Sequence, residues 1–243
     1  MKNLNLLLLP GLLNDARLWR HQIDGLADIA YVTVAELTDA DSMATLAANV
    51  LKQAPNERFA LAGLSMGGYV ALEVMRQAPE RVMALALLDT TARPDTPQST
   101  EARHKLMELA ETKFTAVLDT LIPKQLHPQH LKDATMVETI KAMAKTVGKE
   151  AFFRQQRAII GRIDSRPHLS KIKCPTLILC GREDAITPVE VHEEMKAAIP
   201  SSQFTIIEEC GHLSALEQPK RVTETLRTWL RKVTSNQSVD RTK

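Results

Sequence analysis

The sequence predicts an α/β fold, in which a mostly parallel β-sheet is flanked by helices and a helical segment is inserted between two strands. Short apolar runs rich in strand-forming residues alternate with segments of helical period, as is typical of parallel strands joined by crossover helices. Hydrophobic residues make up 44% of the 243 residues, which suffices for one large core. The six predicted strands are residues 4–9, 29–34, 59–62, 82–88, 176–180 and 204–207.

The first predicted strand, residues 4–9, follows Lys2 and consists largely of leucines, so it superficially resembles a signal peptide. Pro10 and Gly11 interrupt the run, polar residues follow closely, and the sequence shows no small-residue cleavage site. Because a buried parallel strand is also a continuous apolar run, we predict a strand here. No stretch of the sequence approaches the ~20 apolar residues of a membrane span.

Cysteine content and charge indicate the compartment and the kinds of partner. The three cysteines are odd in number and form no C-x-x-C pair, so reduced thiols in a cytoplasmic protein are expected, although Cys180 and Cys210 could lie close together. Lys and Arg total 31 against 29 Asp and Glu, a net charge of +2. This balance, with only five Phe, two Trp and two Tyr, argues against nucleic-acid or membrane partners.

The connections between the predicted strands have helical period. Ser42 is placed to cap a helix between the second and third strands, and a similar apolar stripe occurs near the end of the chain. Each of these helices can bury one apolar stripe against the sheet. The residues of the two stripes are Met43, Leu46, Ala47, Val50 and Leu51, and Val222, Leu226, Trp229 and Leu230.

The alternation of strands and helices stops after Leu88. Residues 91–173 contain no convincing strand, include several prolines and carry apolar residues at helical spacing. We therefore predict a helical cap at 91–173, inserted into a core formed by 1–90 and 174–233, with 234–243 as a flexible tail. Extra helices packed on the sheet edge are the alternative.

A G-x-S-x-G sequence at residues 63–67 directly follows the third predicted strand and begins a helical pattern. This is the context of a nucleophile elbow, a sharp turn that holds a serine hydroxyl above the edge of the sheet. The flanking glycines are needed because side chains there would collide with the tight turn. We predict Ser65 as a nucleophile; a glycine-rich turn with a solvated serine is the alternative.

A serine nucleophile needs a general base that is held by a third group. Of the seven histidines, only His212 lies in a short loop between a predicted strand and a helix, at the same sheet edge as Ser65. Asp184 follows the preceding strand and is the predicted acid. The rival acids are Glu183, beside it, and Asp89, at the end of the fourth strand.

The oxyanion formed by attack on a carbonyl needs hydrogen-bond donors that are already in place. The backbone amide of Met66 lies at the start of a predicted helix, whose dipole favours negative charge. The loop after the first strand, residues 10–14, is expected to supply the second donor, the amide of Leu12.

The pattern of strands, G-x-S-x-G and downstream Asp and His resembles the α/β-hydrolase superfamily, in particular small capped serine hydrolases such as carboxylesterases, enol-lactonases and meta-cleavage-product hydrolases. The resemblance covers nearly the whole chain, from about residue 4 to 232. It implies that Ser65, Asp184 and His212 form a catalytic triad. It also implies that the amides of Leu12 and Met66 bind the oxyanion. Pro10 departs from the histidine that most members carry there.

The resemblance implies a serine hydrolase that cleaves a carboxylic ester or lactone through an acyl-enzyme. Hydrolysis of a C–C bond and a non-catalytic ligand-binding protein of the same fold are the alternatives. We expect a small-molecule substrate, apolar or partly carboxylated, and a monomer or homodimer. The candidate substrate-binding residues are Leu13, Trp19, Leu64, Phe153 and Arg154.

Weaker signals suggest other ligands. Arg154, Arg157 and Arg162 form a basic cluster that could hold a substrate carboxylate, and a solvated helix face is the simpler explanation. His127 and His130 suggest a metal site, but the proline between them and the absence of a nearby cysteine argue against it. No G-x-G-x-x-G or Walker loop is present, so the sequence implies no cofactor.

Overall fold

The computed structural model describes residues 4–240, with side chains as far as Ser235. Its centre is a six-stranded sheet in the order β2-β1-β3-β4-β5-β6, and every neighbouring pair is parallel. Residues of β3, β4 and β5 are buried throughout, which explains why these strands are continuous apolar runs. The strands are β1 Leu4–Leu9, β2 Ala30–Val34, β3 Phe59–Leu64, β4 Val82–Leu88, β5 Thr176–Gly181 and β6 Ser202–Ile207.

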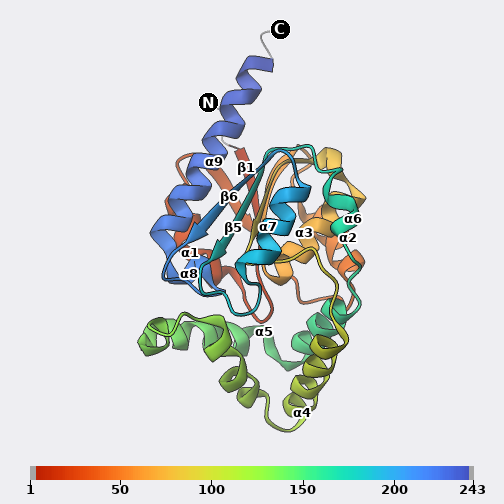
Figure 1. The fold of residues 1–243 in the computed structure, drawn as a ribbon, viewed down its shortest axis with the longest axis vertical. Helices are drawn as coiled ribbons and strands as arrows, with labels where there is room; N and C mark the ends of the chain where they lie inside the picture. Colours follow the sequence, from red (N-terminus) through yellow and green to blue (C-terminus); the bar gives the residue numbers. More distant parts are fainter. Residues whose placement is uncertain (1–3, 241–243) are drawn as a thin grey trace.

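Helices cover both faces of the sheet, so the α/β fold predicted from the sequence is confirmed (Figure 1). One face packs with α1, α8 and α9 into a cluster that includes Trp19 and Trp229, and the other packs with α2, α3 and α7. Ser42 Oγ accepts from Thr45 N–H at 3.1 Å, so the predicted cap of α2 is confirmed. These helices are α1 Arg20–Leu26, α2 Met43–Gln53, α3 Met66–Gln77, α7 Val189–Ala198, α8 Ser214–Glu217 and α9 Pro219–Asp240.

Between β4 and β5 the described chain contains helices and loops and no strand. Two long helices, α4 Pro97–Gln125 and α5 Ala134–Ile160, lie beyond the edge of the sheet at which the parallel strands end (Figure 1). Each is kinked, α4 at Lys113 and α5 at Gly148, where φ is 81°. The short helix α6 Arg166–Leu169 leads back to the sheet. We call the segment from 91 to 173 the cap.

Short turns of 3-10 helix complete the described structure. They are η1 Ala16–Trp19, η2 Pro79–Arg81 and η3 His130–Lys132. No described helix combines the length and the hydropathy needed to cross a membrane.

The last helix, α9, extends into the segment predicted as a tail. Residues 234–240, within the segment predicted as a flexible tail, are helical and continue α9 as far as Asp240; residues 241–243 lie outside the described residues. The segment contains neither Gly nor Pro, so no residue in it stops the helix that the apolar stripe of Val222, Leu226 and Trp229 fixes to the core.

Candidate active site

Ser65 lies in the turn between the last residue of β3 and the first of α3. Its φ of 54° and ψ of −116° are sparsely populated for a residue with a side chain, and such strain persists only where the surrounding structure imposes it. A Cβ at Gly63 would lie 2.3 Å from the Gly67 carbonyl oxygen, and one at Gly67 would lie 2.2 Å from the Leu9 carbonyl oxygen. Both positions therefore require glycine.

Gly67→Ala is expected to destabilise the protein by more than about 2 kcal/mol, because the backbone of β1 or α3 must shift to admit the methyl group. Urea unfolding measures the change. Gly161→Ala is the matched control: its Cβ would lie 3.4 Å from the nearest atom, Arg157 O, and the expected change is within about 0.5 kcal/mol. Equal stability of the two variants would contradict the steric requirement for glycine in the turn.

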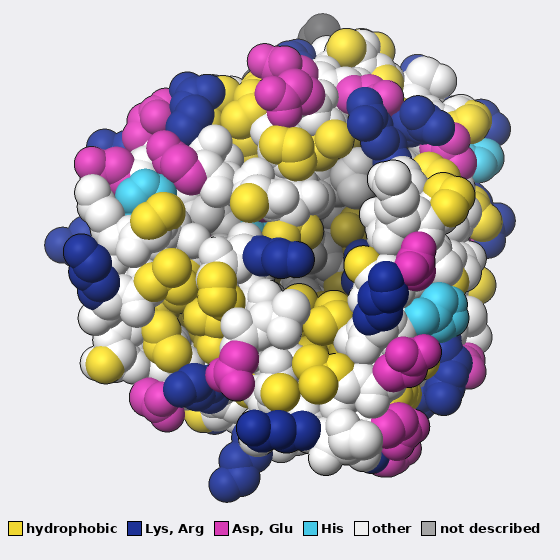
Figure 2. All heavy atoms as spheres, turned by 60° about the horizontal axis from the view of Figure 1, so that its bottom comes forward, with side chains coloured by type: hydrophobic (Ala, Val, Ile, Leu, Met, Phe, Trp, Pro, Cys, Tyr) yellow, Lys and Arg dark blue, Asp and Glu magenta, His cyan; other side chains and the backbone are white. Residues whose placement is uncertain are grey.

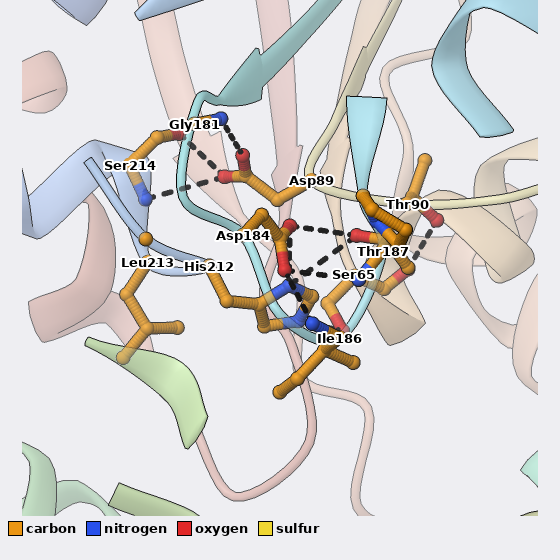
Figure 3. A network of polar contacts seen from close by, with 12 residues as sticks. Ser65, Asp89, Thr90, Gly181, Asp184, Ile186, Thr187, His212, Leu213 and Ser214 are labelled. Carbon is orange, nitrogen blue, oxygen red and sulfur yellow. Dashed lines mark hydrogen bonds and ion pairs between the residues drawn. The ribbon is translucent and has the colours of Figure 1, made fainter. Parts of the chain in front are cut away.

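Ser65, His212 and Asp184 form a continuous chain of hydrogen bonds (Figure 3). His212 Nδ1 lies 2.8 Å from Asp184 Oδ2, and His212 Nε2 lies 2.8 Å from Ser65 Oγ. Because an ionised carboxylate can only accept, Nδ1 carries the ring proton and Nε2 is left to accept from the serine hydroxyl. The structure thus brings together three residues that lie far apart in the sequence.

Asp184 is held by further donors from its own loop. Its Oδ1 accepts from Ile186 N–H at 2.8 Å and Thr187 N–H at 2.9 Å, and Thr187 Oγ1 donates to Oδ2 at 2.7 Å. Burial alone would raise the pKa of Asp184, but the charge and hydrogen bond of His212 and the Thr187 bonds hold it below its usual value. Asp184 therefore remains a carboxylate at neutral pH.

His212 is 2% exposed. Burial disfavours its charged form, but the charge of Asp184 and the hydrogen bond to it raise the pKa of His212 above its ordinary value. A base with a raised pKa takes a proton from a hydroxyl more readily, and the adjacent carboxylate stabilises the imidazolium that forms.

The two rival acids have other partners in the structure. Asp89 Oδ1 accepts from Gly181 N–H at 3.1 Å, and its Oδ2 accepts from Ser214 N–H at 3.2 Å and Ser214 Oγ at 2.5 Å. Glu183 accepts from Cys210 N–H at 2.9 Å. Glu183 thus ties the loop after β5 to the loop after β6, and Asp89 ties the end of β5 to the start of α8. Burial, then the charge of Asp184, raises the pKa of Asp89 well above its usual range.

Thr90, at the end of β4, supports the nucleophile and was not singled out from the sequence. Its hydroxyl donates to the Ser65 carbonyl oxygen at 2.8 Å, and its N–H donates to His192 Nε2 at 3.0 Å. His192 is fully buried, and burial lowers its pKa to about 4, so it is neutral and able to accept. One sequence signal could have identified Thr90: it follows the end of a predicted strand that lies beside β3 in the sheet.

The two predicted oxyanion donors are the amide of Met66, which directly follows Ser65, and the amide of Leu12, in the loop after β1. Met66 is the first residue of α3, where an N–H has no partner within the helix. Leu12 lies in a turn closed by Asn14 N–H donating to Gly11 O at 3.2 Å. A Cβ placed on Gly11 would lie 3.4 Å from Ser65 Cβ, so this turn lies against the nucleophile.

A family model described as "Alpha/beta hydrolase family" matches residues 6–225. This chain belongs to that family. The chain is 33% identical to a thermophilic esterase from Thermogutta terrifontis, whose malate-bound structure superimposes with a TM-score of 0.86. The match covers 95% of this chain and 90% of the esterase. These similarities identify the chain as a hydrolase.

Two curated relatives are more distant. The hydrolase is 25% identical over 221 residues to 3-oxoadipate enol-lactonase 1 of Acinetobacter baylyi, covering 85% of this chain and 81% of the relative. It is 30% identical over 91 residues to the putative carbamate hydrolase RutD of Serratia proteamaculans. That second match covers 37% of this chain and 34% of the relative, so the chain aligns with about a third of that protein's length.

The residues predicted to bind substrate in this hydrolase have different surroundings. Trp19 and Leu64 have no exposed surface and belong to the hydrophobic core, and their assignment to the substrate site stays a prediction. Apolar side chains such as these suit a packed core as well as a substrate pocket, and the sequence pattern cannot distinguish the two roles. Leu13 and Phe153 are 3% and 7% exposed, and Arg154 Nε donates to the Thr38 carbonyl oxygen at 2.8 Å.

The arginines of the cap do not form one cluster in this hydrolase. Arg162 donates to Asp95 at 2.5 Å and lies over the Tyr69 ring, whereas Arg154 is bound to Thr38. His130 Nδ1 lies 2.8 Å from Glu217 Oε2. Among the described residues, no three His, Cys, Asp or Glu side chains are arranged to hold a metal ion.

Proposed function

We propose that this hydrolase cleaves a carboxylic ester or lactone through an acyl-enzyme on Ser65. The observation that carries the proposal is the hydrogen-bonded chain from Ser65 Oγ through His212 to Asp184, at the end of the strained turn after β3. The similarity to an esterase over 95% of the chain supports it.

In the proposed first step, Ser65 Oγ attacks the carbonyl carbon while His212 Nε2 takes the hydroxyl proton. The carbonyl oxygen becomes an oxyanion, which the amides of Leu12 and Met66 stabilise by hydrogen bonds. When the tetrahedral intermediate collapses, His212 returns the proton to the departing alkoxide oxygen. A lactone would open at this step, and its alcohol end would stay attached through the acyl group.

In the second step, a water molecule attacks the acyl carbonyl and gives its proton to His212. Collapse of the second intermediate breaks the bond to Ser65 Oγ, which takes that proton back. Asp184 remains ionised throughout and keeps the Nδ1 proton in place. The products are a carboxylic acid and an alcohol, or a hydroxy acid from a lactone.

The cap supports an apolar substrate. Its buried residues facing the core include Val117, Leu118, Ile140, Met143 and Phe152. Figure 2 shows that the face on the cap side is hollowed, with hydrophobic side chains around the hollow and a Lys or Arg side chain at its rim. An apolar acyl or alcohol group with one carboxylate fits this combination of side chains.

The test is reaction with a fluorophosphonate and with a panel of p-nitrophenyl esters, lactones, amides and carbamates. We expect a burst of p-nitrophenol with short-chain esters and covalent labelling at Ser65, because both need a serine activated by His212. Ser65→Ala is the control and is expected to give neither.

Two outcomes would contradict the proposal. Labelling of Ser65→Ala equal to that of the wild-type protein would show that the reagent reacts elsewhere. Saturable binding of small carboxylates without turnover of any panel member would favour a ligand-binding protein. A vinylogous diketone measured beside the esters tests C–C hydrolysis, and faster cleavage of the diketone would favour that alternative.

A further inference from the structure

A glutamine of the cap is inserted between two loops of the core. Gln155, on α5, is 1% exposed. Its Oε1 accepts from Leu13 N–H at 3.0 Å, and its Nε2 donates to the Leu37 carbonyl oxygen at 2.9 Å. Leu13 lies in the loop after β1, and Leu37 lies in the loop after β2. One side-chain amide from the cap therefore satisfies a backbone group in each of these loops.

The first of these loops carries the amide assigned to the oxyanion. Leu13 has a φ of 59°, in the left-handed region that a leucine rarely adopts. Such a conformation persists only where surrounding contacts impose it. The peptide plane that contains Leu13 N–H also contains the Leu12 carbonyl, so the bond to Gln155 fixes the backbone on one side of Leu12.

We propose that Gln155 is a positioning residue, which holds the loop after β1 so that the Leu12 amide faces the oxyanion. The inference depends on the proposed function of Ser65. It also means that the cap contributes to the chemistry of the core: a cap displaced from the core would release Leu13 and loosen the oxyanion site.

The residues on either side of Gln155 make different contacts, so a variant of a neighbouring residue can serve as a control. Arg154 donates to the Thr38 carbonyl oxygen, one residue after Leu37, so two consecutive cap residues bind consecutive carbonyls. Gln156 is fully buried, but its Oε1 accepts from Arg103 of α4, within the cap. Only Gln155 of these three reaches the loop that contains Leu12.

The experiment replaces Gln155 by methionine, which has similar length and volume but no amide. With a short-chain p-nitrophenyl ester, we expect kcat of Gln155→Met to fall by about 10- to 100-fold, the scale of a misplaced catalytic group or a weakened oxyanion donor. KM is expected to stay within about threefold, since ground-state binding does not use this bond. Labelling by a fluorophosphonate is expected to slow in parallel, because its phosphonyl oxygen occupies the same donors.

Two further variants separate positioning from general loss of stability. Gln156→Met removes a buried cap glutamine of the same size and is expected to keep kcat within about threefold. Gln155→Glu keeps an acceptor for Leu13 N–H and loses only the donor to Leu37, so it is expected to retain more activity than Gln155→Met. If Gln155→Met fails to fold by circular dichroism, Gln155→Glu and Gln156→Met decide the question.

The proposal is overturned if Gln155→Met keeps wild-type kcat, or if Gln156→Met loses kcat to the same extent. If Gln155→Met does not fold, a labelling rate of folded Gln155→Glu below wild type, beside a wild-type rate for Gln156→Met, supports the proposal, and equal rates for Gln155→Glu and wild type overturn it. Failure of the wild-type protein to turn over any ester or to be labelled would instead refute the proposed function, and this inference with it.

Discussion

His212→Ala is expected to lower kcat for short-chain esters by about 10⁴- to 10⁶-fold, the scale seen when a member of a serine triad is removed. The reason is that Ser65 Oγ is bonded to His212 Nε2, so no group remains to take the hydroxyl proton. Steady-state kinetics measure the effect, and circular dichroism checks that the variant is folded.

His130→Ala is the matched control for this variant. His130 bonds to Glu217 at the edge of the cap, and its loss is expected to change kcat by less than about tenfold. A His212→Ala enzyme with activity near that of His130→Ala would mean that another group is the base, and the assignment of His212 would be wrong.

Asp184→Asn is expected to lower kcat by about 10⁴-fold with the fold intact, because an amide favours the wrong imidazole tautomer. It is also expected to change the pH profile. Activity rises with pH as His212 loses its proton, and in the wild-type protein the midpoint of this rise lies above the ordinary histidine value. Removal of the charge that raises the pKa of His212 moves the midpoint to lower pH.

Residual kcat/KM of Asp184→Asn, measured between about pH 5 and 9, gives the midpoint. Glu183→Gln is the control in the same loop: its partner is Cys210 N–H, and its pH midpoint is expected to match wild type. A shift to lower pH for Glu183→Gln and none for Asp184→Asn would reverse the assignment of the acid.

Much of the fold could be predicted from the sequence because a parallel sheet buried on both faces leaves a strong signal. The runs that became β1, β3, β4 and β5 are almost uninterrupted apolar segments, and their predicted ends differ from the observed ones by at most two residues. The edge strands were predicted as closely: the prediction for β2 began one residue early, and that for β6 began at Phe204, whereas pairing with β5 begins at Ser202.

The candidate site followed from the same topology. Parallel strands end at one edge, so residues directly after β3, β5 and β6 had to converge, and Ser65, Asp184 and His212 do. Gln155 could not be found in this way. It lies near the C-terminal end of a cap helix, and its partners are backbone groups more than a hundred residues away, for which a sequence carries no signal.

The contacts made at the end of β4 have a consequence for protein engineering. Asp89 joins the end of β5 to the start of α8, and Thr90 donates to the Ser65 carbonyl oxygen. All of these groups belong to the core. The cap begins just beyond these two residues and also holds the base, because His212 N–H donates to the Gln125 carbonyl oxygen of α4 at 2.7 Å. A graft of another hydrolase's cap must therefore reproduce two contacts, the carbonyl that accepts from His212 N–H and the amide that reaches Leu13, and donor caps can be chosen on these two criteria.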